Sequence, residues 1–152
     1  MCSVKYALGI LLLLKNVLLF KKIQMPVQKI IHGGQTIGVK ILRPAAGSTP
    51  VTGMDDPLQA LTISHPAGHI IAPHVHSRAP RSTQKMQKAL VVISGKIKID
   101  LYSEEKEKIK SLTLTSGQAF VLLAGDWSVR FLEKSQLLEF KNGPFLNDKM
   151  LI

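Results

Sequence analysis

KALVVISGKIKIDLY, residues 88 to 102, is the stretch that decides the fold. In its second half the apolar residues Ile97, Ile99 and Leu101 alternate with charged ones. Such alternation is typical of a strand with one buried face, and the Ser-Gly pair in the middle is typical of a turn. The stretch therefore predicts two strands joined by a tight turn, and we expect them to pair as a β-hairpin.

The remainder of the chain after Met25 shows the same pattern of short apolar runs and turns. No long run of the helical period interrupts it, and residues 43–57, rich in Gly and Pro, are expected to be a loop. Strands at this spacing predict an all-β domain, either an antiparallel sandwich or a barrel. The further expected strands are 36–42, 58–64, 109–114, 118–123, 127–133 and 136–141.

Composition restricts the possible functions. A chain of 152 residues with 45% hydrophobic content is long enough for one core. The formal net charge is +10, but the basic residues are scattered and no nucleic-acid-binding motif accompanies them, so no nucleic-acid partner is expected. Cys2 is the single cysteine, which excludes an intrachain disulfide and favours a cytoplasmic location.

The beginning of the sequence differs from the rest. Residues 1–24 are apolar, and their longest uninterrupted apolar run, residues 6–14, is too short to cross a bilayer. This segment could be a weak membrane anchor, a helix packed on the domain or an upstream extension. We expect an extension outside the barrel, with residues 25–152 as the domain and with membrane contact only if the extension is present and exposed.

A histidine pair suggests a site. In GHIIAPHVHSRAP, residues 68–80, His74 and His76 lie two positions apart. On a strand, residues two apart face the same side, so both imidazoles could enter a barrel and bind one metal ion. The alternative is that both rings are exposed or hydrogen-bonded locally.

Residues 25–152 resemble a small single-domain cupin. The first cupin motif has a glycine, His-x-His, a glutamate and a second glycine; here Gly68, the two histidines and Gly95 match it, and Lys88 stands at the place of the glutamate. The second motif corresponds to Gly117, then Leu-Ala-Gly, then Ser128 at the place of its histidine. The resemblance implies a double-stranded β-helix, the cupin jelly-roll barrel, with a central pocket and pairing into a homodimer.

Two of the four expected metal ligands are replaced. A lysine ammonium at position 88 would repel a divalent ion, and Ser128 is a poor ligand, so we expect metal binding by His74 and His76 to be weak or absent. No cofactor is firmly predicted, although zinc, nickel, manganese or iron remains possible. Restoring Glu at 88 and His at 128 would be expected to strengthen the site, and His65 or His69 could be proposed as substitute ligands.

Two groups of cupins are most similar. One is associated with polysaccharide biosynthesis, and the other comprises the metal-independent sugar-nucleotide 3,4-ketoisomerases, in which a His-x-His pair acts as acid and base. The residues allow three functions: a pocket for a small anionic or sugar-like ligand, an isomerase or epimerase in which the histidine pair is catalytic, or a metal-dependent enzyme with unusual ligands. Whether the chain is an enzyme stays open. The expected ligand-binding residues are His74, His76, Lys88, Trp127 and Ser128.

Overall fold

The computed structural model describes residues 26–77, 80 and 83–143, and this part of the chain contains ten strands and no helix. The prediction of an all-β domain is confirmed. None of the described residues belongs to a helix long and apolar enough to span a membrane. The strands are β1 (Val27–His32), β2 (Gln35–Ile41), β3 (Gly47–Pro50), β4 (Leu61–Ser64), β5 (Lys88–Ser94), β6 (Lys96–Tyr102), β7 (Lys108–Thr115), β8 (Ala119–Leu122), β9 (Asp126–Phe131) and β10 (Gln136–Lys141).

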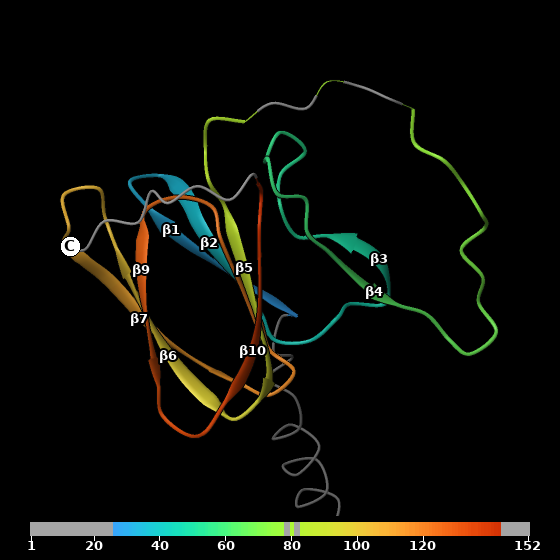
Figure 1. Ribbon diagram of the computed structural model, residues 1–152. Helices are drawn as coiled ribbons and strands as arrows, with labels where there is room; N and C mark the ends of the chain where they lie inside the picture. Colours follow the sequence, from blue (N-terminus) through green and yellow to red (C-terminus); the bar gives the residue numbers. More distant parts are fainter. Residues whose placement is uncertain (1–25, 78–79, 81–82, 144–152) are drawn as a thin grey trace, which may run out of the picture.

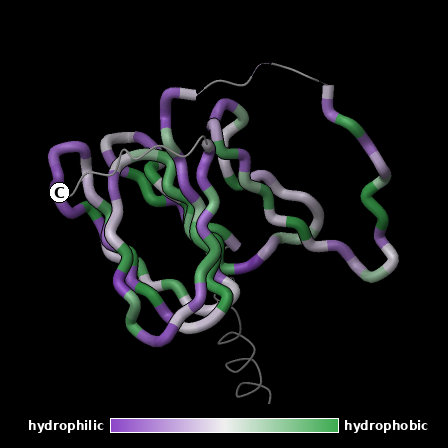
Figure 2. The backbone as a smooth tube through the Cα atoms, viewed as in Figure 1, coloured by the Kyte–Doolittle hydropathy of each residue, from purple (hydrophilic) through white to green (hydrophobic). Residues whose placement is uncertain are grey.

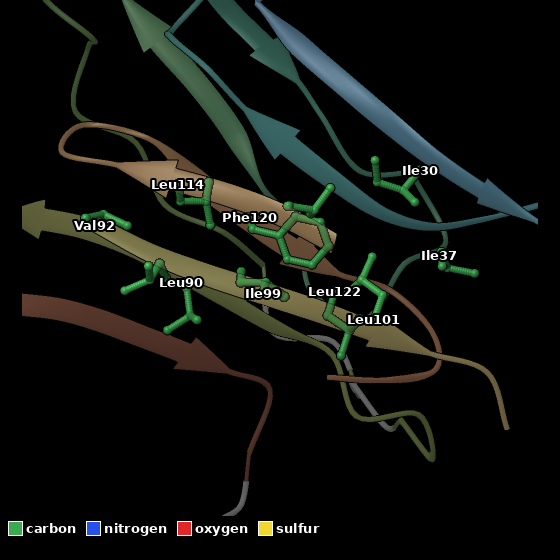
Figure 3. Packing of buried hydrophobic residues seen from close by; sticks show 11 residues of the cluster. Ile30, Ile37, Leu90, Val92, Ile99, Leu101, Leu114, Phe120 and Leu122 are labelled. Atoms are coloured by element: carbon green, nitrogen blue, oxygen red, sulfur yellow. The ribbon is translucent and has the colours of Figure 1, made fainter. Parts of the chain in front are cut away.

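Two antiparallel sheets form the body of the domain (Figure 1). One has five strands in the order β1-β2-β8-β5-β10, and the other has three in the order β7-β6-β9. Apolar side chains from both sheets make one buried cluster, with Phe120 at its centre (Figure 3). Along the strands hydrophilic and hydrophobic residues follow one another, as Figure 2 shows. The molecule is therefore a two-sheet sandwich with its main core between the sheets.

The predicted hairpin over residues 88–102 does not form. Its two strands exist with the expected bounds, but β5 pairs with β8 and β10, whereas β6 pairs with β7 and β9. Gly95 has a φ of 86° and takes the chain from one sheet to the other. The turn between β9 and β10 occupies the space beside it, because Ser135 donates to the Lys96 carbonyl oxygen and accepts from the Lys96 amide. Contacts distant in sequence thus replace the local pairing.

Other differences between the predicted and the observed strands lie in the first half of the chain. The expected strand 36–42 corresponds to β2, but only the last four residues of 58–64 form a strand, β4. Two strands were not predicted: β1, and β3 within the expected loop 43–57. β3 pairs with β4 in a small separate sheet, outside the five-stranded one.

The histidine-containing segment lies outside the sandwich. Residues 65–77 have no strand structure and are exposed, and Figure 1 shows them making a wide excursion beyond β3 and β4 before the chain returns to β5. The expectation that this region is a strand facing the interior is therefore not met. The predicted extension, residues 1–24, lies outside the described residues.

Candidate functional site

Lys88 is the first residue of β5, at the end of the strand away from Gly95. It has the same orientation as Leu90 and Val92, two core residues that follow it at intervals of two. Its side chain therefore begins on the face that the second sheet covers, and the residue is half-buried. Register places it opposite Leu122 of β8 on one side and Lys141 of β10 on the other. We call this end of the sandwich the Lys88 end.

Trp127 meets Lys88 from the opposite sheet. It is the second residue of β9, lies opposite Leu101 of β6, and packs against the main core. Its ring centroid is 5.7 Å from the Lys88 Nζ and 6.0 Å from the Phe120 ring centroid. The ammonium group over the ring is a cation–π contact, which links the two sheets at this end.

Two lysines lie side by side on the interior face here. Lys141 ends β10 directly opposite Lys88, and directly opposite residues of an antiparallel pair share a face. Both residues are half-buried. Two positive charges therefore lie on adjacent strands at this end. Lys141 was not among the predicted site residues, because the successive Leu137 and Leu138 hide the alternation of β10.

A buried glutamine holds the start of β5 in place. Gln87 is fully buried, and its side-chain amide donates to Asp56 Oδ1 at 2.9 Å and to the Leu123 carbonyl oxygen at 3.3 Å. Its Oε1 accepts from the Leu58 backbone N–H at 2.9 Å, and the backbone N–H of Gln87 donates to Asn142 Oδ1 at 2.6 Å. With the bond from the Asn142 amide to its carbonyl oxygen, the residue before Lys88 is thus fixed by five hydrogen bonds. Nothing in the sequence around Gln87 distinguishes it from the exposed Gln84.

Ser128 does not join this group. Consecutive strand residues point to opposite faces, so Trp127 turns inward and Ser128 outward, opposite Asp100 of β6. Ser128 is exposed, and its hydroxyl lies 3.4 Å from the Tyr102 hydroxyl. Asp100, nearly buried on the same outer face, accepts from Ser111 and pairs with Lys108 at 2.9 Å. The hydrogen bonds from Ser111 and Lys108 lower the pKa of Asp100 to about 2.

The four histidines of residues 65–77 lie on the exposed segment outside the sandwich. His74 and His76 are exposed, with ring centroids 5.2 Å apart in an edge-to-face arrangement, and His74 Nδ1 is 2.9 Å from the Ala72 carbonyl oxygen. His65 and His69 form a separate stacked pair with centroids 3.7 Å apart. Among the described residues no three His, Cys, Asp or Glu side chains come together as a possible metal site.

Comparison of the chain with protein-family models, with curated proteins and with solved structures found no match. Of the five predicted ligand-binding residues, the structure brings together Lys88 and Trp127. It places His74 and His76 on the outer segment and Ser128 on the outer face of the three-stranded sheet.

Proposed function

We propose that this chain is a cupin-type jelly-roll domain that binds a small anionic, sugar-like ligand at the Lys88 end. The observation that carries the proposal is the position of the Lys88 ammonium, half-buried and 5.7 Å from the Trp127 ring centroid. The two facing antiparallel sheets and the glycine spacing of the cupin motifs support the fold assignment.

The chemistry of this end suits such a ligand. An ammonium group binds phosphate or carboxylate oxygens through charge-assisted hydrogen bonds, and Lys141 adds a second positive charge on the adjacent strand. The flat Trp127 ring offers apolar area against which the C–H groups of a sugar can pack. Leu122, opposite Lys88 on the other side, provides an apolar boundary.

The isomerase alternative needs a general base beside the ligand. His74 and His76 were the candidates for that role, but both are exposed on the segment outside the sandwich. A metal-dependent enzyme would need further ligands near the same pair, and none of the described residues provides a cluster of three. We therefore propose that the domain binds its ligand, and the proposal includes no catalytic step.

Two wider expectations accompany this proposal. We place the protein in the cytoplasm, because its single cysteine, Cys2, leaves it without intrachain disulfides. We also expect a homodimer.

Trp127 is the single tryptophan of the chain, so its fluorescence reports directly on the site. We expect glucose 1-phosphate to change this fluorescence in a saturable way, and glucose to bind more weakly. Lys88→Met should weaken binding of glucose 1-phosphate about tenfold or more, since a charge-assisted hydrogen bond is worth roughly 1.5–3 kcal/mol. Lys110→Met, on an exposed position of β7, is the matched control. Equal binding by wild type and Lys88→Met would contradict the proposal.

A further inference from the structure

The outer face of the five-stranded sheet carries a second apolar cluster, separate from the main core. Its buried members are Val39, Val51, Val121 and Leu123. Val39 of β2 and Val121 of β8 lie directly opposite each other, whereas Val51 belongs to residues 51–60, which connect β3 to β4. This connection therefore covers part of the outer face of the sheet.

A cavity of about 400 Å³ lies between the sheet and this connection, at the side of β1. Val39 and Leu123 of the sheet line it, and Val51, Thr52 and Gly53 line it from the connection. Small-molecule sites are usually cavities of roughly 300–1,000 Å³ in which a few polar groups accompany an apolar lining. The size of this cavity is thus sufficient for a small organic ligand.

An irregularity in the pairing of β1 with β2 directs Thr36 to the cavity. Lys29 of β1 lies opposite Val39. Two residues later on β1, Ile31 lies opposite Thr36, which is three residues from Val39 on β2. Directly opposite residues share a face, so Thr36 joins Val39 on the outer face, while the extra residue, Ile37, is buried in the main core. The Thr36 hydroxyl has no hydrogen-bond partner among the residues that the structure describes.

Two lysines give the cavity its positive charge. Lys29 of β1 and Lys85, which precedes β5, both line it and are both exposed. Within the described part of the chain neither side chain makes an ion pair. A lysine side chain is flexible, so each ammonium group is available to an anion in the cavity.

One carboxylate, that of Asp56, opposes these two charges. Its Oδ2 accepts from the Gly53 backbone N–H at 2.7 Å, and its Oδ1 accepts from the Gln87 side-chain amide at 2.9 Å. Gln87 also donates to the Leu123 carbonyl oxygen, so one buried side chain fixes two walls of the cavity. Two lysines against one aspartate leave the lining with a net charge of +1.

We propose that this cavity binds a small monocarboxylate with a short aliphatic body. The carboxylate accepts hydrogen bonds from the two ammonium groups and from the Thr36 hydroxyl. The aliphatic body packs against Val39, Val51 and Leu123. A single negative charge matches the net charge of the lining, whereas a phosphate, with about two charges near neutral pH, would be repelled by Asp56.

The cavity and the Lys88 end lie on opposite faces of the five-stranded sheet. Lys88 lies opposite Leu122 on the interior face, and the next opposed pair, Ala89 and Val121, belongs to the outer cluster. Trp127 packs in the main core and is therefore separated from the cavity by the sheet. Each of the two sites can consequently be tested without the other.

The first test adds hexanoate to the full chain, labelled for nuclear magnetic resonance. We expect saturable shifts of the backbone amide signals of Thr36, Thr52 and Gly53, with saturation below about 20 mM. 1-Hexanol has the same number of carbons but no charge, and it should bind at least about tenfold more weakly. Equal affinity for the two compounds, or no shift of these signals with hexanoate, would overturn the proposal.

Lysine variants examine the positive charges. Lys29→Met and Lys85→Met should each weaken hexanoate binding about threefold or more, and the double variant about tenfold or more, because charge-assisted hydrogen bonds are lost. Binding of 1-hexanol should stay unchanged in the double variant. Lys110→Met, on an exposed position of β7 in the other sheet, is the matched control. A double variant that binds hexanoate as tightly as wild type would refute the assignment of the two lysines.

A third test distinguishes this cavity from the Lys88 end. Saturation with hexanoate should leave the Trp127 fluorescence unchanged, and Lys88→Met should bind hexanoate as wild type does. Inorganic phosphate should shift the three amide signals only at much higher concentration than hexanoate. Loss of hexanoate binding in Lys88→Met would place the carboxylate at the other site. Phosphate binding in the cavity as tight as that of hexanoate would exclude a monocarboxylate site.

Discussion

Gly95 and Ser135 occupy adjacent space at the point where the chain twice changes sheets. A Cβ atom added to Gly95 would overlap the Ser135 side chain and the Lys134 carbonyl oxygen, and Gly95 has a φ of 86°. The turn after β5 and the turn after β9 thus pack directly on each other. This contact closes the sandwich at the end opposite Lys88.

Gly95→Ala should strongly destabilise the protein. The positive φ alone costs about 1–2 kcal/mol for a residue with a Cβ, and the overlap with backbone atoms adds to this. We expect a loss of roughly 3 kcal/mol in the free energy of unfolding, measured by urea denaturation. Gly117→Ala is the control, since Gly117 has a similar φ of 77° but no atom within 4 Å of its added Cβ. Equal losses in the two variants would show that the packing against Ser135 is unimportant.

Gln87→Leu should also lower the free energy of unfolding. The substitution keeps the volume but leaves the Leu58 amide and the Leu123 carbonyl oxygen without the glutamine partner. Each buried group left without a partner costs about 1–3 kcal/mol, so we expect a loss of roughly 2–4 kcal/mol. Gln84→Leu, at an exposed position, should change the free energy of unfolding by less than about 0.5 kcal/mol. Equal urea midpoints for the two variants would contradict this role.

Asp100 makes the free energy of unfolding depend on pH. Its pKa is lowered to about 2 from an ordinary value of 3.8, so its ionised form stabilises the folded state above pH 4, and this contribution disappears as the pH falls toward 2. Wild type should exceed Asp100→Asn in stability by on the order of 1–2 kcal/mol at pH 6, because each pKa unit corresponds to about 1.4 kcal/mol before screening. At pH 2 the two proteins should unfold together. A constant difference between pH 6 and pH 2 would contradict this assignment.

The metal question has a direct test. Restoring the cupin ligand types with Lys88→Glu and Ser128→His should not create a tight zinc site, contrary to the expectation from the motifs. Residue 128 faces away from residue 88, and both His74 and His76 lie outside the sandwich. Elemental analysis after a chelator wash and zinc addition should give much less than one zinc per chain for wild type and for the double variant. Full occupancy in the double variant alone would show that the histidine segment can enter the sandwich.

Sequence reasoning succeeded where a residue pattern acts locally. The alternation in residues 96–102 predicted which side chains of β6 are buried, and Ile97, Ile99 and Leu101 are all in the core. It failed where the outcome depends on distant contacts. The partners of β5 are strands more than 25 positions later in the chain, and packing around Gly95 directs β5 toward them. No local residue pattern indicates this pairing.

The candidate site was predicted in part for a similar reason. Lys88 was assigned to the site because of its motif position, and the structure brings it to Trp127. Trp127 and Ser128 are consecutive, however, and strand alternation alone excludes that both face the same interior. Gln87 and Lys141 were missed because their importance comes from partners distant in the sequence, Asp56 and Lys88 respectively.

The strand order also determines when the protein can fold during synthesis. β5 is made before either of its partners, β8 and β10, and β6 must wait for β7 and β9. β2 likewise gains its second neighbour only with β8. β5 therefore remains unpaired until β8 has been made, and the five-stranded sheet is complete only when residues 136–141 have left the ribosome. During that interval the partly made chain exposes the kind of edge that aggregates and that chaperones recognise.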